Sequence, residues 1–399
     1  MLFILVAIFG CYVLLTSYKS RPRPGATILA NFDRSFGRED VSSPMISGPL
    51  TADNDGNLYW TSPTVGAEHG GVIFRMTADG RVSPAYTFDR PDVDAVEPIN
   101  GVIQASDGNF YGTTRSNRPG TVTGTLYRLT LRGEVTVLHT FGVEKADPQL
   151  PNSLLVEDQD GMFYGTTAVG GLTGDGAVYR MTRAGKFSVL HFFGDDEIDG
   201  KTPSGGLTLG ADGNLYGTTE FGGRDNRGIV YQLTPTGKLT VLHSFGSVSD
   251  DGENPKNGVV QDNDGNLYGT TGAGGRAGVG AIFKISPNGD YALLYSFPRS
   301  VQGDGVGQSS IIAGSDGFLY GTTCSAGANR IGNDFAGQFF RLSKQGEMTS
   351  LYSFGATPGD GVCPEDERLV AGTNGIFYGS TFAGGTHGLG TIYRMVVPK

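Results

Sequence analysis

The sequence has little cysteine, little basic charge and few long apolar segments. Three Cys in 399 residues are too few for a disulfide framework or a Cys-based metal cluster. The net charge of −10 argues against a nucleic-acid-binding surface, which needs a basic face. No stretch of a dozen residues keeps a 3.6-residue apolar period without Gly or Pro, so long helices are not expected. Gly is abundant, with 65 residues, but it does not recur at every third position, which excludes collagen. The composition therefore predicts many short strands and tight turns.

The longest apolar run lies at the amino terminus, over residues 2–15. It is shorter than the roughly 18–20 residues of a transmembrane helix, and neither a preceding Lys or Arg nor a small-x-small cleavage site accompanies it. We expect residues 1–18 to be an uncleaved anchor or an export signal, with membrane contact through residues 2–18 and a linker over 19–25. A buried core segment is the alternative. The basic residues after the run favour a cytoplasmic body, which opposes export and leaves the orientation open.

One sequence unit recurs seven times. A motif close to Asp-Gly-Asn-Leu-Tyr-Gly-Thr-Thr appears in every unit, and its Tyr is followed by an apolar-aromatic-basic-apolar motif and then by a Val-Leu-His-Ser-Phe motif. Spacings of 52, 53, 52, 52, 52 and 58 residues separate the seven Tyr, a period typical of repeat architectures such as propeller blades. The motif Tyr residues are Tyr59, Tyr111, Tyr164, Tyr216, Tyr268, Tyr320 and Tyr378.

Each unit predicts four short strands, which we name A to D. In the fourth unit they are expected near 206–209, 214–219, 229–234 and 238–245, with the Asp212-Gly213 and Thr236-Gly237 turns between A and B and between C and D. The seventh unit lacks strand D, but residues 26–32 resemble it. An open sheet edge invites aggregation, so this segment is expected to complete the seventh sheet. We predict an all-β, seven-bladed β-propeller over residues 26–399, closed by strand 26–32 in blade 7.

The repeat also resembles a known family. Leu215-Tyr216-Gly217-Thr218-Thr219, Gly222-Gly223 and Val241-Leu242-His243-Ser244-Phe245 are similar to the bacterial choice-of-anchor tandem repeat, the Gloeobacter/Verrucomicrobia (GloVer) repeat. The resemblance covers residues 26–395. It implies exported proteins that varied anchors hold at the cell surface, and it implies no catalytic residues.

Residues that recur in every blade are expected to serve the blade. The Tyr and Gly of strand B are interpreted as packing residues, because Gly permits a close approach to a neighbouring ring. His139, His191 and His243 occupy equivalent positions on different blades, too far apart to share a metal ion. No metal site and no cofactor are therefore expected.

Two recurrent acidic patterns leave alternatives open. Asp-x-x-x-Pro precedes strand A and could form a ring of cation-binding carboxylates, although a turn in which Asp accepts local backbone N–H bonds is preferred. The segments 262–265 and 158–161 resemble fragments of a calcium loop, but they lack further oxygen ligands at fixed spacing, so hairpin turns are preferred. The Asp-x-x-x-Pro pattern begins at Asp40, Asp94, Asp147, Asp199, Asp251 and Asp360, with Asp304 as a variant.

Non-repeated residues are better candidates for ligand contacts. Strand alternation places the B–C and D–A loops on one face of the ring, and these loops are long and variable. Glu68, His69 and His387 could converge for acid–base chemistry because blades one and seven are neighbours, although solvated loop residues are the preferred interpretation. The candidate binding residues on this face are Arg115, Asn117, Arg118, Glu220, Arg224, Asp225, Asn226, Arg227, Arg276, Arg330, Asn333 and Asp334.

The two cysteines of the repeat region are expected to form a disulfide. Cys324 begins the B–C loop of blade six, and Cys363 lies in the D–A loop that leads into blade seven, on the same face. A Cys324–Cys363 disulfide would require an oxidising compartment.

Two functions remain in competition. The first is an extracytoplasmic (periplasmic or cell-surface), membrane-anchored binding or scaffold protein, whose partner is a glycan, an envelope protein or a membrane complex. The second is a propeller polysaccharide lyase or glycoside hydrolase. The sequence lacks the common hydrolase, metalloprotease, P-loop and dinucleotide-binding motifs, which favours the first.

Overall fold

The computed structural model describes residues 25–32, 46–63, 70–88, 96–116, 123–144, 147–196, 198–299, 310–324, 326–332, 334–364 and 369–397. These residues form strands and turns, and none of them is helical. The described residues accordingly contain no helix that could cross a membrane. The apolar run of residues 2–15 lies outside them.

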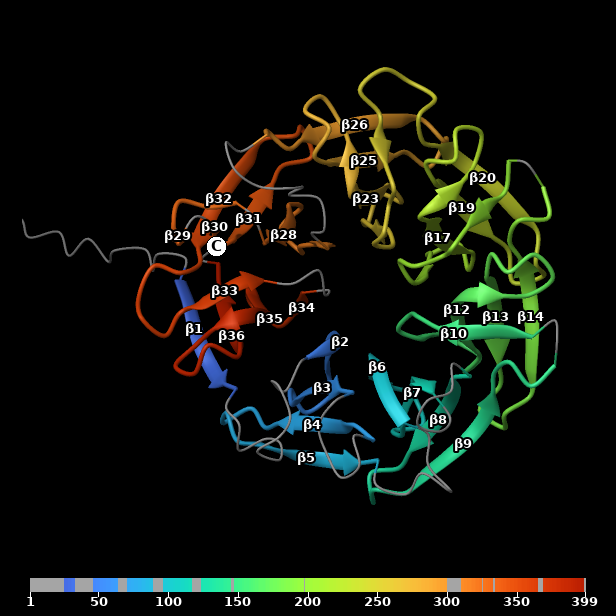
Figure 1. Ribbon diagram of the computed structural model, residues 1–399, viewed down its shortest axis with the longest axis horizontal. Coiled ribbons are helices and arrows are strands. Elements are labelled where there is room, and N and C mark those ends of the chain that lie inside the picture. The colour runs from blue at the N-terminus through green and yellow to red at the C-terminus, as the bar shows by residue number, and fades with distance from the viewer. Residues whose placement is uncertain are drawn as a thin grey trace, which may run out of the picture.

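Seven antiparallel sheets form a closed ring around a central channel, as predicted (Figure 1). In each blade the strands follow one another outward from the channel. Blade one holds β2 (Ser47–Ala52), β3 (Leu58–Ser62), β4 (Val72–Met76) and β5 (Val82–Thr87). Blade two holds β6 (Val96–Gln104), β7 (Phe110–Ser116), β8 (Thr125–Leu129) and β9 (Val135–Thr140). Blade three holds β10 (Pro148–Pro151) and β11 (Val156–Glu157), followed by β12 (Phe163–Gly170), β13 (Ala177–Met181) and β14 (Phe187–Phe192).

The second half of the ring repeats this order and adds short two-stranded ribbons. Blade four holds β16 (Thr208–Leu209), β17 (Leu215–Thr219), β19 (Ile229–Leu233) and β20 (Leu239–Ser244), with the ribbon β15 (Gly200–Lys201) and β18 (Phe221–Gly222). Blade five holds β22 (Val260–Gln261), β23 (Leu267–Thr271), β25 (Ala281–Ile285) and β26 (Tyr291–Ser296), with the ribbon β21 (Gly252–Glu253) and β24 (Ala273–Gly274). Blade six holds β27 (Ile311–Ala313), β28 (Leu319–Thr323), β31 (Gln338–Leu342) and β32 (Met348–Ser353), with the ribbon β29 (Arg330–Ile331) and β30 (Asp334–Phe335).

Blade seven closes the ring with both ends of the repeat region. It holds β33 (Gly361–Pro364), β34 (Val370–Ala371), β35 (Ile376–Gly384) and β36 (Thr391–Val396), and its outermost strand is β1 (Gly25–Asn31). β1 pairs antiparallel with β36, from Gly25 opposite Val396 to Asn31 opposite Thr391. The predicted closure is therefore confirmed, and Figure 1 shows β1 in blue beside the red strands of blade seven.

The core lies between the blades, where rings from the strands fill the space. In blade four Gly217 lies opposite Tyr231, and a Cβ on this glycine would overlap the phenol ring of Tyr231. The packing role predicted for the strand-B glycine is thus visible in its contacts. Blade one differs, because Trp60 occupies the glycine position and stacks on Phe74 with ring centroids 5.4 Å apart.

The single Trp also marks the junction between the first and last blades. Trp60 is fully buried and contacts the edge of Phe32, with ring centroids 6.1 Å apart, at the end of the closing strand. Ile392 of blade seven belongs to the same apolar cluster. The ring is therefore closed by side-chain packing as well as by the β1–β36 ladder.

Candidate functional site

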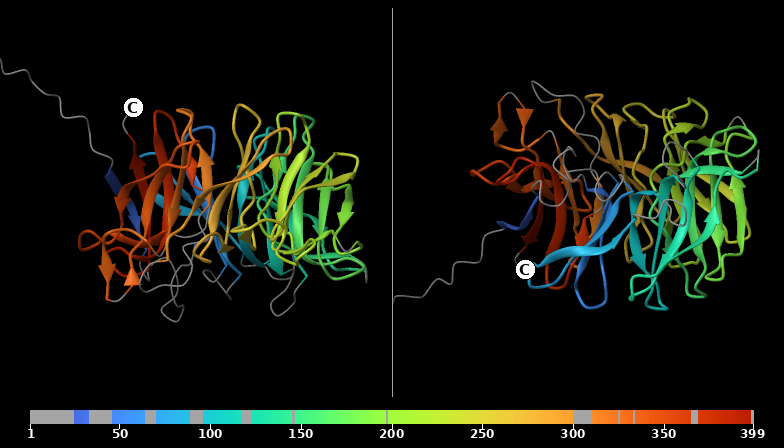
Figure 2. Two further views of the ribbon diagram at one scale, coloured as in Figure 1. Left: turned by 90° about the horizontal axis from the view of Figure 1, so that it is seen from above. Right: turned by 60° about the horizontal axis from the view of Figure 1, so that its bottom comes forward.

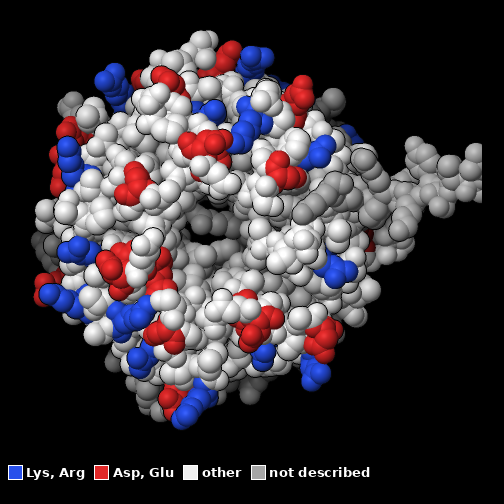
Figure 3. Space-filling model, turned by 180° about the vertical axis from the view of Figure 1, so that it is seen from behind, with Lys and Arg blue, Asp and Glu red and all other residues white. Residues whose placement is uncertain are grey.

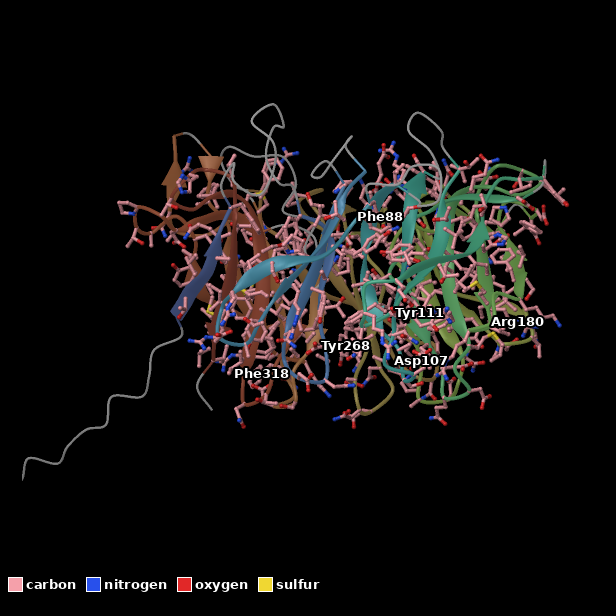
Figure 4. The ribbon with its side chains drawn as sticks, turned by 90° about the horizontal axis from the view of Figure 1, so that it is seen from below. Phe88, Asp107, Tyr111, Arg180, Tyr268 and Phe318 are labelled. Atoms are coloured by element: carbon pink, nitrogen blue, oxygen red, sulfur yellow. A yellow bond between two sulfur atoms is a disulfide. The ribbon has the colours of Figure 1, made fainter. Side chains whose placement is uncertain are left out.

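The two faces of the ring carry different connections. Seen from the side, the A–B and C–D turns lie at one face, and the B–C and D–A loops lie at the other (Figure 2). In Figure 4, Asp107 and Tyr111 mark the turn face, and Phe88, at the end of a D strand, lies toward the loop face.

On the loop face, the Asp of Asp-x-x-x-Pro organises the D–A loop. Asp251 is buried, and its carboxylate accepts backbone N–H bonds from Gly246 at 2.9 Å and from Gly252 at 2.8 Å. Its Oδ2 also accepts a bond from His243 Nε2 at 3.0 Å. The turn interpretation thus describes this position, because the carboxylate oxygens are already occupied by donors. Asp40, Asp94 and Asp304 lie outside the described residues.

The contact with strand D was not anticipated from the sequence. His191 Nε2 bonds Asp199 Oδ2 at 3.0 Å, and Tyr352 Oη donates to Asp360 Oδ2 at 2.8 Å. The signal was present, because the His or Tyr precedes its Asp by eight residues in each case. The pair occurs in blades three, four and six, so it is a structural feature of the blade.

Two candidate binding residues of blade four form ion pairs between blades. Arg227 Nη1 lies 2.5 Å from Glu253 Oε1, and Glu220 Oε1 lies 3.4 Å from Lys256 Nζ. At the position equivalent to the first pair, Asp175 and Lys201 carry opposite signs and lie 3.7 Å apart. An ion pair is therefore found at both junctions, but the acidic and the basic residue have exchanged places. Arg227 and Glu220 tie blade four to blade five.

The other candidate residues are dispersed over the loop face. Asn226 Oδ1 accepts the Gly222 N–H at 3.0 Å, which shapes its own loop, and Arg330 lies over the Phe335 ring at 4.0 Å. Arg115, Arg224, Asp225, Arg276 and His387 are exposed. Glu68, His69, Asn117, Arg118, Asn333 and the side chain of Asp334 lie outside the described part, so the convergence of Glu68, His69 and His387 stays a prediction.

A disulfide joins blades six and seven on this face. The Sγ atoms of Cys324 and Cys363 are bonded, the pair expected from the sequence. The bond connects the loop after β28 to β33, which lies in blade seven at the opposite edge of the sheet from the closing strand β1. It links blade six covalently to blade seven, the blade in which the two ends of the ring meet.

On the turn face, strand-B tyrosines bind the A–B turns. In blades one to six the Tyr hydroxyl donates to the Asp of its own turn, and the Asp lies six residues earlier in blades one, three and five but four residues earlier in blades two, four and six. The Oη–Oδ2 distances are 3.2 Å for Tyr59–Asp53, 2.8 Å for Tyr111–Asp107, Tyr164–Asp158 and Tyr216–Asp212, 3.1 Å for Tyr268–Asp262 and 2.6 Å for Tyr320–Asp316.

These hydrogen bonds perturb both partners. Burial and the adjacent carboxylate raise the pKa of Tyr164 to about 12. Burial alone would raise the pKa of Asp262, but hydrogen bonds from Lys344, Asn266 and Tyr268 lower it to about 2. The carboxylates that resembled calcium-loop fragments are thus held as turn acceptors. In the described residues, no three His, Cys, Asp or Glu side chains are grouped so that they could hold a metal ion.

Acidic side chains surround the mouth of the channel on the turn face, with basic side chains beside them (Figure 3). Lys344 of blade six reaches across to blade five, with Nζ 2.8 Å from Asp262 Oδ2 and 2.9 Å from Asp264 Oδ2. This ion pair borders a hollow of about 530 Å³ that extends from blade five to blade seven, and Phe318 and Phe377 also line it. Arg183 holds the equivalent position in blade three and lies 2.6 Å from Glu157.

The repeat defines the family. The Gloeobacter/Verrucomicrobia repeat matches residues 16–159 and 150–393. The chain belongs to this family. GloVer repeats therefore form the blades of this propeller, and the resemblance noted in the sequence is confirmed. No curated protein is significantly similar to this GloVer-repeat chain in sequence.

Solved structures with low sequence identity share the fold. The polysaccharide lyase Uly1 is 12% identical, with a TM-score of 0.53 over 92% of this chain and 93% of the lyase. Puromycin hydrolase is 13% identical, with a TM-score of 0.52 over 88% of this chain and 52% of the hydrolase. At such identities the likeness concerns the fold alone.

Proposed function

We propose that this GloVer-repeat propeller is a non-enzymatic binding or scaffold protein, held at the outer side of a membrane through residues 2–18. Its partner is a glycan, an envelope protein or a membrane complex that meets the B–C and D–A loops. The observation that carries the proposal is the difference between the faces. The turn face repeats one Asp–Tyr contact in six blades, whereas the loop face presents charges that differ from blade to blade, including the exposed Arg115, Arg224 and Arg276.

The disulfide supports an extracytoplasmic location. Cys324–Cys363 joins adjacent blades. Structural disulfides persist in oxidising compartments, such as the bacterial periplasm or the cell surface. An uncleaved segment over residues 1–18 would keep the propeller at the membrane. Fractionation of cells that produce the full chain is expected to place it in the membrane fraction and accessible to protease from the outer side.

The function is tested with the full chain in detergent, on a glycan array and on a panel of polysaccharide-degradation assays. Binding without degradation is expected, and charge reversal of Arg115 and Arg276 together is expected to weaken it at least five-fold. The matched control reverses Arg132 on the turn face, which should leave binding unchanged. Degradation of a polysaccharide would instead favour the lyase or hydrolase alternative, and protection from external protease would contradict the location.

A further inference from the structure

The junction between blades three and four lacks an aromatic ring that its neighbours possess. His139 of blade two stacks on Phe187 of blade three, with centroids 3.8 Å apart and planes inclined by 5°. His243 of blade four stacks on Tyr291 of blade five in the same way, at 3.7 Å and 1°. At the junction in between, His191 faces blade four. The position equivalent to Phe187 and Tyr291 holds Leu239, as the strand register shows.

A hollow opens where the ring would lie. Its volume is about 690 Å³, and His191, Leu239 and Val241 contribute to its walls. A hollow beside His139, lined by residues between 137 and 147, measures about 500 Å³. The His191 side chain is 21% exposed, whereas the stacked His243 is 8% exposed. The His191 imidazole is therefore partly accessible from outside, where it lines the hollow.

The rim of this hollow is acidic. Asp195 and Asp196 are exposed at its edge, and they are not part of the repeated pattern. The carboxylate of Asp199 is already bonded to His191 and to the backbone N–H groups of Gly194 and Gly200, so it offers little to a ligand. Arg224 also lines the hollow, so two exposed acidic side chains accompany one basic side chain there. A planar group that carries positive charge suits both the stacking surface and the rim.

We propose that this hollow binds a planar cation, a guanidinium or an amidinium group, stacked between His191 and Leu239. Its N–H groups pair with the carboxylates of Asp195 and Asp196, as planar cations pair with carboxylates in general. Ile198, which is 49% exposed at the rim, covers the apolar part of the ligand. The arginine side chain of a partner and a free amidine share this chemistry. The site lies at the outer edge of two blades and does not depend on the glycan or envelope partner proposed above.

The probe is benzamidine, titrated into the full chain in detergent and followed by NMR and calorimetry. Saturable binding with a stoichiometry of one is expected, and neutral benzamide is expected to bind at least ten-fold more weakly. N-acetyl-arginine amide, titrated in parallel, separates a peptide arginine from a free aromatic amidine. Absence of saturable benzamidine binding, or equal binding of benzamide, overturns the proposal.

Two variants locate the site. Leu239→Phe restores the ring found at the neighbouring junctions and is expected to weaken benzamidine binding at least ten-fold. Thr240→Phe, at the adjacent exposed position of the same strand, is the matched control and should bind as the wild type does. The double exchange Asp195→Asn and Asp196→Asn alters only exposed groups, so it tests the rim without disturbing the core, and at least a five-fold loss is expected. Undiminished binding in either test variant overturns the proposal.

Discussion

Ion pairs on the turn face of this propeller form both between neighbouring blades and within one blade. Lys344 and Arg183 hold the second position of equivalent C–D turns, and each reaches carboxylates at an A–B turn or strand end. Alanine, leucine or proline occupies this position in blades one, two, four and five. Both cations at this position have an acidic partner. The Lys344 contact cannot be predicted from a single repeat, because Asp262 and Asp264 belong to the preceding blade.

Removal of the Lys344 cation tests this connection. In Lys344→Met the pKa of Asp262 is expected to rise from about 2, and the free energy of unfolding at pH 7 to fall by about 1 kcal/mol. A lowered pKa in the folded state contributes stability above the ordinary Asp range, and this stability is lost as the pH falls through about 4 toward 2. The difference between variant and wild type should therefore shrink below pH 4.

The measurements are an NMR titration of the Asp262 carboxyl carbon and denaturant unfolding at pH 7 and pH 3. Lys238→Met removes an exposed cation from the C–D turn of blade four and is the matched control, with a change below about 0.5 kcal/mol. An unchanged Asp262 pKa in Lys344→Met would contradict the assigned role.

At the scale of the strands, the sequence predicts most of the fold, but it predicts fewer of the contacts between strands. The 52-residue period and the Asp-Gly turns located strands such as β17 and β19 within one or two residues, because a hairpin turn and a two-residue alternation are local properties. The eight-residue spacing of His191 and Asp199 could have predicted their contact. The hollow beside Leu239 could not be predicted, because it depends on the register of two blades at once.

The strand-B glycine provides a test of packing within a blade. A Cβ on Gly217 would overlap the buried ring of Tyr231, so Gly217→Ala is expected to lower the free energy of unfolding by about 3 kcal/mol. Gly213, in the A–B turn, has a positive φ of 77° and open space around it, so Gly213→Ala should cost only about 1 kcal/mol. Urea unfolding measures both.

The overlap with Tyr231 can be isolated by a double-mutant cycle. In a Tyr231→Ala background the ring is gone, and Gly217→Ala should then cost less than about 1 kcal/mol. Additive costs in the cycle would show that the glycine is needed for its backbone rather than for the close approach of the ring.

At the scale of the whole molecule, the ring of seven sheets is closed at blade seven. Both the ladder between β1 and β36 and the disulfide lie at or beside blade seven, where the two chain ends meet. A ring that opens at this junction would expose an unpaired strand edge. We therefore expect the stability of the propeller to depend more on this junction than on any of the others.

The disulfide contributes through the 39-residue separation of its cysteines. Cys324→Ser with Cys363→Ser is expected to lower the free energy of unfolding by about 3–4 kcal/mol, because the unfolded chain regains the freedom of that loop. Unfolding in the presence and absence of a reductant gives the same comparison in the wild type. Rapid alkylation of Cys324 and Cys363 in the native, unreduced protein would contradict the bond.

The side-chain packing at this junction can be followed by the fluorescence of Trp60. Phe32→Ala removes the ring that touches Trp60 at the end of the closing strand, and the cavity should lower the free energy of unfolding by about 3–5 kcal/mol. Trp60 fluorescence should shift to longer wavelength as water reaches the indole.

Phe141→Ala at the junction of blades two and three removes a ring of equal burial and is the matched control. It should cost a similar free energy but leave the native Trp60 emission unchanged. If Phe32→Ala also left that emission unchanged while destabilising the fold, Phe32 would not be packed against Trp60, and the ring would be closed by the β1–β36 ladder without this contact.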